Sequence, residues 1–121
     1  AQVFLAEHAG KVLAGAVIIF SGTSAFYHHG ASVPPSNNLP AAYLLQWEAI
    51  RLAKRRGCRW YNFWGIAPSN QPNHPWAGLT AFKQGFGGRS EAYLHAQDYP
   101  LSRRYWLTSA VERLRRARRG L

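Results

Sequence analysis

Lys83 is a candidate for charge-based chemistry, because it follows an aromatic residue and a long polar loop. Phe82 precedes it directly, and residues 67–75 are rich in proline and asparagine. A loop of that length in a compact domain often carries function. A lysine ammonium beside an aromatic wall can stabilise an oxyanion or bind a phosphate. On residue type alone, an ordinary solvated lysine is the better interpretation, because most lysines are exposed.

Cysteine and histidine chemistry has weaker support. Cys58 is the only cysteine, which excludes an internal disulfide. A nucleophile–base pair of Cys58 with a histidine stays open, but its position before an expected strand favours a small buried residue. His28 and His29 are neighbours on an expected strand, so they should point to opposite faces and cannot bind one metal ion together. The sequence therefore predicts no metal site.

Carboxylate and nucleotide-binding patterns are also sparse. Glu48 lies three residues before Arg51 on an expected helix, which predicts a solvated ion pair. Asp98 precedes a proline and should cap the last helix. With no evident acid pair, a mechanism that needs two carboxylates is disfavoured. The chain has no GxxxxGK[ST] and no GxGxxG after a strand, and the glycines of residues 85–88 are interpreted as helix-end residues.

The charge balance is strongly basic and points to an anionic partner. Fifteen Lys and Arg residues oppose five Asp and Glu, which gives a formal net charge of +10. Most of these cations are arginines, whose planar fork fits phosphate. The candidate RNA-binding residues lie on or after the last expected helix: Arg113, Arg115, Arg116, Arg118 and Arg119. A solvated basic tail or an arginine-rich coding background would explain the same charge.

Aromatic residues border the expected loops and could stack on a nucleobase. The set comprises Tyr27, Trp60, Tyr61, Phe63, Trp64 and Trp76. Core packing explains most of these residues equally well. The candidate substrate-binding residues are Tyr27 and Trp64 from this set and Asn38 from the polar loop at residues 30–39.

The first elements should form an antiparallel meander. Residues 2–7, 12–21 and 24–29 have the composition of strands, and glycine-containing turns separate them. The chain of 121 residues fits one domain, and no apolar run reaches the roughly 20 residues that span a bilayer.

A capped amphipathic helix should follow over residues 41–56, with Pro40 at its start and Gly57 at its end. Its apolar stripe is Ala42, Leu45, Ala49, Leu52 and Ala53, and Gln46 is expected to face away. Residues 59–66 form the next expected strand. A helix, a glycine and a strand in this order predict a crossover and a parallel pair.

Three more elements are expected in the rest of the chain. A short helix over residues 77–86 should bury Leu79, Phe82 and Phe86, residues 89–96 should form a strand, and residues 100–118 a last helix. The apolar stripe of that helix is Leu107, Ala110, Val111, Leu114 and Ala117. The order β-β-β-α-β-α-β-α predicts an α/β (α+β) fold, a mixed central sheet with helices on both faces.

Four stretches together resemble the C-terminal half of FemABX-type aminoacyltransferases. They read FYHHGAS, LPAAYLLQWEAIRLAKRRGCRWYNFWGIAP, HPWAGLTAFKQGFGG and YLHAQDYPLSRRYW, and they cover about Phe26 to Trp106. Members of this family resemble two fused acetyltransferase-like (GNAT-fold) domains. The resemblance implies that residues 1–121 form a single GNAT-like domain, the C-terminal part of a longer two-domain protein. The N-terminal domain, which supplies much of the precursor site in the family, is expected outside this chain.

The resemblance also implies an activity, partners and catalytic residues. Family members transfer an amino acid from aminoacyl-tRNA to a muramyl-pentapeptide precursor, lipid-linked or UDP-linked. The family's Phe-Lys pair falls on Phe82 and Lys83, which favours a catalytic lysine that stabilises the oxyanion of acyl transfer. Neither a metal nor another cofactor is implied. The expected location is the cytoplasm, with peripheral contact at the inner face of the membrane.

Two alternatives stay open. One is an acyl-CoA-dependent N-acetyltransferase of GNAT type, although residues 32–39 lack the expected GxG pattern. A helix N-terminus could still hold phosphate there. The other is a non-catalytic RNA-binding module, which only the charge supports. The transferred amino acid, the form of the acceptor and the oligomeric state stay open as well.

Overall fold

The structure is a computed structural model that describes residues 1–34, 39–68, 71, 73–94 and 97–119. The chain divides into two compact units, Ala1–Gly65 and Ile66–Leu121. The first unit holds a sheet and one helix, and the second holds two helices. Whether the two units make up one domain, as the sequence predicts, stays a prediction.

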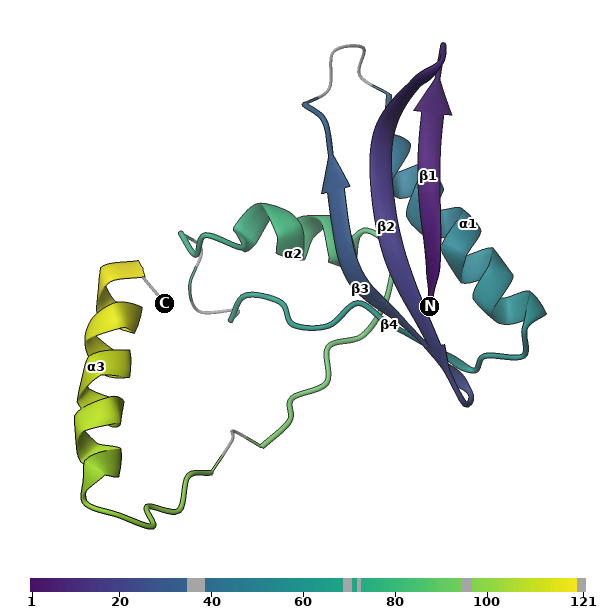
Figure 1. The fold of residues 1–121 in the computed structure, drawn as a ribbon. Helices are drawn as coiled ribbons and strands as arrows, with labels where there is room; N and C mark the ends of the chain where they lie inside the picture. The colour runs from purple at the N-terminus through teal and green to yellow at the C-terminus, as the bar shows by residue number, and fades with distance from the viewer. Residues whose placement is uncertain (35–38, 69–70, 72, 95–96, 120–121) are drawn as a thin grey trace. The chain divides into compact units, whose positions relative to one another are not determined.

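The sheet of the first unit has four strands in the order β1-β2-β3-β4 (Figure 1). They are β1 (Gln2–His8), β2 (Lys11–Ser21), β3 (Ser24–Ser32) and β4 (Trp60–Asn62). The first three pair antiparallel, so the predicted meander is confirmed, and β3 continues beyond the expected residues. Ala9 and Gly10 join β1 to β2 with φ angles of 49° and 72°, a conformation that tight two-residue hairpins require and glycine adopts easily.

The crossover from β3 to β4 runs through α1 (Ala41–Arg55). This helix ends on Gly57 at φ 78°, and the Cys58 N–H donates to the Ala53 carbonyl at 3.0 Å. That bond satisfies a carbonyl that the helix end leaves free. The chain then enters β4, which pairs parallel to β3. The predicted helix, glycine stop and parallel strand are therefore confirmed.

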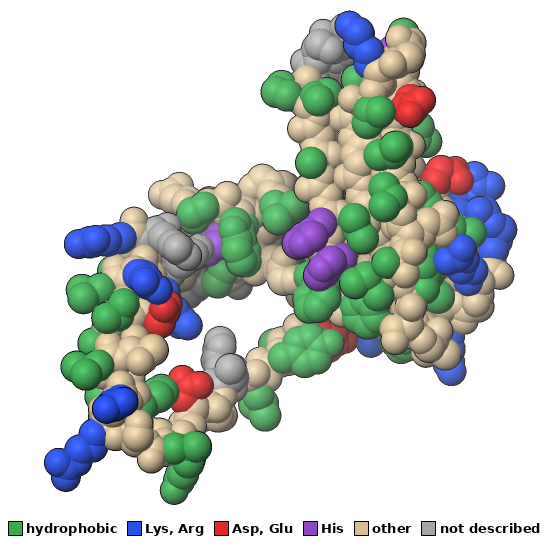
Figure 2. Space-filling view, in the orientation of Figure 1, with side chains coloured by type: hydrophobic (Ala, Val, Ile, Leu, Met, Phe, Trp, Pro, Cys, Tyr) green, Lys and Arg blue, Asp and Glu red, His purple; other side chains and the backbone are tan. Residues whose placement is uncertain are grey.

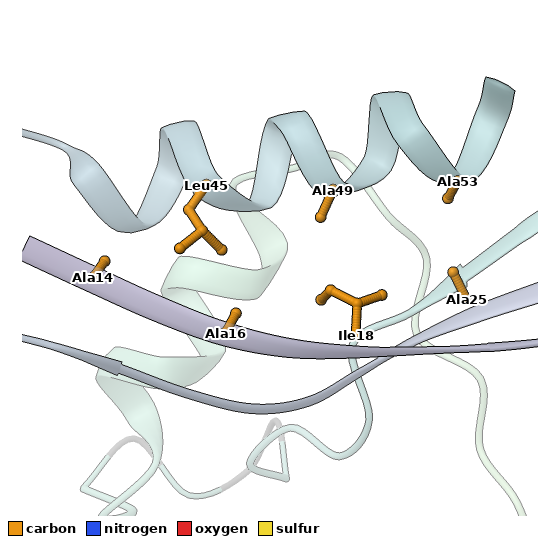
Figure 3. Packing of buried hydrophobic residues seen from close by; sticks show 7 residues of the cluster. All are labelled: Ala14, Ala16, Ile18, Ala25, Leu45, Ala49 and Ala53. Carbon is orange, nitrogen blue, oxygen red and sulfur yellow. The ribbon is translucent and has the colours of Figure 1, made fainter. Parts of the chain in front are cut away.

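A small alanine-rich core lies between α1 and one face of the sheet (Figure 3). Its buried residues are Ala14, Ala16, Ile18, Ala25, Leu45, Ala49 and Ala53. Most of these side chains are a single methyl group, which lets the helix backbone approach the sheet closely, and Ile18 fills the space between them. Leu45, Ala49 and Ala53 of the predicted stripe of α1 are therefore confirmed as core residues.

The strand β4 is much shorter than the predicted strand over residues 59–66. It ends at Asn62, whose Oδ1 accepts a hydrogen bond from the Trp64 N–H at 2.7 Å. This side-chain-to-backbone bond forms a local turn that competes with the sheet. Trp64 consequently takes a φ of 62°, which no strand residue adopts.

The second unit contains α2 (Ala77–Gln84) and α3 (Arg104–Arg119). The predicted strand over residues 89–96 is wrong for residues 89–94, which have no strand structure, and residues 95–96 lie outside the described part. Leu94 is 98% exposed there, so this segment has no packed face that would hold it against a sheet. The last helix begins at Arg104, later than the predicted residue 100, so Asp98 does not cap it and instead accepts a hydrogen bond from the Tyr105 hydroxyl at 2.7 Å.

Within the described ranges, no helix is both long and apolar enough to cross a membrane.

Candidate functional site

Lys83 is buried in α2, with only 8% of its surface exposed. Burial removes water from the ammonium and lowers the pKa of Lys83 below its ordinary value. The solvated-lysine interpretation is therefore wrong. The predicted burial of Leu79 is wrong too, because Leu79 is 42% exposed and α2 turns the lysine inward instead. The apolar pattern of the sequence could not predict the burial of Lys83, because such a pattern assigns every lysine to the solvent-exposed side of a helix.

The loop that precedes α2 is tied to the helix. The Ala67 N–H donates to Thr80 Oγ1 at 2.8 Å, and Ala67 itself is buried. This bond brings the first loop residue to the middle of α2. Within the same unit, the Phe82 ring meets Phe86 edge-to-face at 5.6 Å between centroids. The helix that carries Lys83 is thus tied to its loop by a hydrogen bond, and an aromatic pair packs along its Phe82 side.

Farther along the loop, His74 and Trp76 form a second local contact. Their rings lie 5.4 Å apart in a T-shaped arrangement, and the Trp76 N–H donates to His74 Nδ1 at 3.1 Å. Trp76 is the residue before the first turn of α2. The imidazole therefore takes the place of a side-chain cap at this helix start.

In the first unit, Tyr27 lies along the face of β3 that packs against α1. It packs against the core cluster and meets the Phe63 ring edge-on at 6.2 Å. Its hydroxyl lies directly over Gly30, where a Cβ would collide with it. Glycine at this position therefore leaves room for the ring. Burial raises the pKa of Tyr27, so its hydroxyl is a neutral hydrogen-bond donor at physiological pH.

A buried polar pair lies on the same side of the sheet. Gln46 is 1% exposed, and its Oε1 accepts a hydrogen bond from the Tyr61 hydroxyl at 2.7 Å. Burial, with a smaller contribution from Tyr27, raises the pKa of Tyr61. The predicted outward position of Gln46 is wrong, because the tyrosine supplies the partner that a buried amide needs. The spacing of Gln46 to Ala49 and Ala53 fits the buried stripe, so its burial was missed only because glutamine is a polar residue.

The opposite side of β3 carries a second aromatic group. Trp64 lies 6.0 Å from Phe26 and 6.2 Å from His28 between ring centroids. Phe26 and Tyr27 are consecutive strand residues, so their side chains leave opposite faces. The two predicted substrate-binding aromatics, Tyr27 and Trp64, are therefore not brought together.

The prediction that His28 and His29 point to opposite faces is wrong. Val17 pairs with His29 and the next residue of β2 pairs with Tyr27, so His28 is an extra residue in a β-bulge. The bulge resets the alternation, and the two imidazole rings lie 4.3 Å apart. Figure 2 shows histidine side chains in contact among hydrophobic ones on this part of the surface. Among the described residues, no cluster of three or more His, Cys, Asp or Glu could hold a metal ion.

Trp64 is held in a strained backbone conformation. A positive φ is rare for a bulky residue and costs on the order of 1–3 kcal/mol. The ring is nonetheless 57% exposed, so core burial does not compensate for this cost. Strained residues of this kind gather at binding sites, where the conformation presents a side chain to a ligand.

The remaining sequence-predicted residues are scattered. Asn38 lies outside the described residues. Of the predicted RNA-binding arginines, Arg113, Arg115, Arg116 and Arg118 are exposed on α3, and the side chain of Arg119 lies outside the described part. Arg115 Nη1 lies 3.0 Å from Glu112. Cys58 is partly buried against the core cluster, in agreement with its interpretation as a small packing residue.

These features define an α+β protein with a mixed four-stranded sheet in one unit and a buried lysine on a short helix in the other. The chain belongs to the FemAB family, whose family model matches residues 1–113. The resemblance found in the sequence is therefore confirmed.

Individual relatives have related names. The chain is 30% identical over 99 residues to a protein of Staphylococcus haemolyticus named lipid II:glycine glycyltransferase, with 81% of this chain and 24% of the relative covered. A protein of the same name from Staphylococcus epidermidis is 29% identical, with 79% and 23% covered. The chain thus spans about a quarter of the length of these relatives. The crystal structure of FemX matches with a TM-score of 0.59 and 28% identity, over 64% of this chain and 19% of FemX.

Proposed function

We propose that this chain is the catalytic-lysine part of a tRNA-dependent aminoacyltransferase that adds an amino acid to the stem peptide of a peptidoglycan precursor. The observation that carries the proposal is the burial of Lys83, because a buried cation costs free energy that a solvated one does not. Membership of the FemAB family and the names of the relatives support the type of reaction. The product would be an interpeptide bridge of the cell wall.

The proposed reaction is an ester-to-amide acyl transfer. The neutral amine of the stem peptide attacks the ester carbonyl of the aminoacyl-tRNA and forms a C–N bond. The carbonyl oxygen becomes negative, and the Lys83 ammonium stabilises it without giving up its proton. The C–O bond to the ribose then breaks, and its electron pair goes to the ribose oxygen. That oxygen finally receives the proton that the amine releases, through the vicinal ribose hydroxyl or through water.

Phe82 is the proposed partner of Lys83. Its edge-to-face contact with Phe86 packs the two rings together at the end of α2, directly beside the lysine. An oxyanion partner is useful only if it is preorganised, because it must not reorganise during the reaction. We therefore assign Phe82 to holding the lysine in place.

Substrate binding is assigned to Tyr27, Trp64 and Asn38. The exposed ring of Trp64 is suited to stacking on a terminal base or sugar of the donor. The neutral hydroxyl of Tyr27 is suited to donating a hydrogen bond to a carbonyl of the precursor. Of the sequence-predicted arginines, Arg115, Arg116 and Arg119 carry charge that an RNA acceptor stem would meet.

The proposed context is a GNAT-like domain in the C-terminal part of a longer protein. The antiparallel meander, the helical crossover and the similarity to FemX support this arrangement. The relatives' names include lipid II, which supports a lipid-linked precursor and hence a cytoplasmic enzyme at the inner face of the membrane.

The proposal is tested by supplying the full-length protein with total tRNA charged with radiolabelled amino acids. Lipid-linked and UDP-linked precursors are offered in separate reactions, and the labelled product is measured. We expect transfer of label to one precursor, dependent on intact aminoacyl-tRNA. Transfer from acetyl-CoA without any transfer from tRNA would replace the proposed donor. Binding of tRNA with no transfer to either precursor would contradict an enzymatic role.

A further inference from the structure

The helix α3 has an apolar side that the described residues of the chain leave exposed. This apolar stripe consists of Trp106, Leu107, Ala110, Val111, Leu114 and Ala117, all of which are exposed. Leu107 is 72% and Leu114 66% exposed. Their spacing of three and four residues places them on one side of the helix. A globular protein would normally bury such a stripe, so its exposure indicates an interaction surface.

Arginines border this stripe and cover the far side of the helix. At the helical repeat, Arg113 lies at one edge of the stripe, and Arg118 lies within it near the other edge, between Leu107 and Val111. Arg116 lies across from the stripe. Glu112 is the only acidic residue in the sequence of α3, and it is paired with Arg115. Figure 2 shows hydrophobic and basic side chains side by side over this helix. The surface is therefore apolar and strongly cationic at once.

These two properties together select one kind of occupant. Binding to an RNA backbone would account for the arginines, but exposed leucines and a tryptophan add no affinity for phosphates. A groove on a partner protein would cover the stripe. The bordering arginines would then lie at the rim of that interface, where charged residues contribute little binding free energy. An anionic lipid surface uses both, because the stripe enters the boundary between headgroups and acyl chains while arginines reach the phosphates.

We propose that α3 binds an anionic membrane surface, lying in its plane with the apolar stripe toward the lipid and with Arg113 and Arg118 on lipid phosphates. Trp106 belongs to the residue type that favours the membrane interface. This contact is peripheral and needs no membrane-spanning segment. It stands on the composition and exposure of α3 and does not depend on acyl transfer.

The stripe is tested with two matched pairs of leucine substitutions in the full chain. Leu107→Gln with Leu114→Gln removes apolar area from the stripe. Leu94→Gln with Leu101→Gln makes the same chemical change at leucines that are 98% and 90% exposed outside any helix. Cosedimentation is measured with vesicles of phosphatidylcholine alone and of equal parts phosphatidylcholine and phosphatidylglycerol. We expect binding only to the anionic vesicles, weakened about tenfold or more by the stripe pair and unchanged by the control pair.

The charge is tested in the same assay. Arg113→Gln with Arg118→Gln should weaken binding to the anionic vesicles by roughly tenfold or more, and added salt should reduce binding further. Lys54→Gln with Arg55→Gln removes the same charge from the end of α1 and should have a much smaller effect. Equal losses for both pairs would mean that net charge alone holds the protein to the vesicles, which contradicts a bound helix.

Three results would overturn the proposal. The first is no binding to the anionic vesicles. The second is vesicle binding that the Leu107 and Leu114 substitutions leave unchanged. A melting temperature of this variant far below that of the control pair would count equally against the proposal, because it would show that the stripe packs against protein. The third is a loss of tRNA binding without a loss of vesicle binding in the Arg113 and Arg118 variant, which would assign these arginines to RNA. None of these results depends on whether the protein transfers amino acids.

Discussion

The two units of the chain place apolar and charged residues in opposite ways. In Ala1–Gly65, alanines and Ile18 are buried between α1 and the sheet. In Ile66–Leu121, a lysine is buried on α2 while Leu107 on α3 is exposed. The first arrangement stabilises the fold by removing apolar area from water, and neither a buried ammonium nor an exposed leucine does this. The comparison indicates that the packing which stabilises the fold lies in the first unit, and it agrees with our proposal that the second carries the catalytic lysine and the membrane-binding helix.

The largest expected effect lies in the core of the first unit. Ile18→Ala should destabilise the protein by about 3 kcal/mol, because it removes a fully buried side chain and leaves a cavity. Leu114→Ala in α3 should change stability by less than about 0.5 kcal/mol, because that leucine is exposed. Urea unfolding of the two variants measures both. Similar losses would mean that α3 is packed into a core in solution, and the contrast between the units would fail.

A smaller effect is expected at the buried polar pair. Tyr61→Phe should cost about 1–3 kcal/mol, because it leaves the buried Gln46 oxygen without its donor. Combining it with Gln46→Leu should cost less than the sum of the single changes, because no polar atom is then left unpaired. Tyr105→Phe removes the exposed hydrogen bond to Asp98 and serves as the control, with a smaller loss. Additive costs at Gln46 and Tyr61 would show that the pair is not coupled.

The smallest expected effect is a pH dependence of stability from Lys83. Its pKa in the folded protein is lowered, so the unfolded chain binds this proton more tightly. The cost of burying the charge is therefore fully present below the folded pKa. It is relieved as pH rises from there through the unfolded value of 10.5. Relative to Lys83→Met, the wild-type protein should gain stability across this window, as measured by urea unfolding at each pH. A constant difference between the two would contradict burial of the ammonium.

The first unit could be predicted from the sequence because local rules decide it. Gly10 and Gly57 mark turns, and the alanines of α1 recur at helical spacing. The prediction failed where a side chain makes a hydrogen bond that the hydrophobic pattern does not show. Asn62 ended a strand by bonding to the Trp64 backbone, and a partner hydroxyl allowed Gln46 inside.

The second unit was harder to predict because its elements lack the patterns that such rules use. The alternation over residues 89–94 indicates a strand only if a neighbouring strand is present to pair with it. The helix α3 has nearly the predicted bounds. Its apolar stripe indicates that one side contacts a partner, but the pattern alone does not identify that partner. Lys83 could be chosen as a candidate only through the family resemblance, since charge alone predicts exposure. Its burial became visible only in three dimensions.

The single-turnover rate of the Lys83→Met variant is the most direct test of the central claim. Aminoacyl-tRNA and precursor are mixed with excess full-length protein, and the rate is compared with that of Lys54→Met, the same change at an exposed lysine. The account predicts a loss of about a hundredfold or more for Lys83→Met with a melting temperature that is not lowered, since one preorganised oxyanion partner is lost. Lys83→Arg should also be impaired, and Lys54→Met should keep the wild-type rate. Near wild-type transfer by Lys83→Met would contradict the account and move the catalytic charge elsewhere.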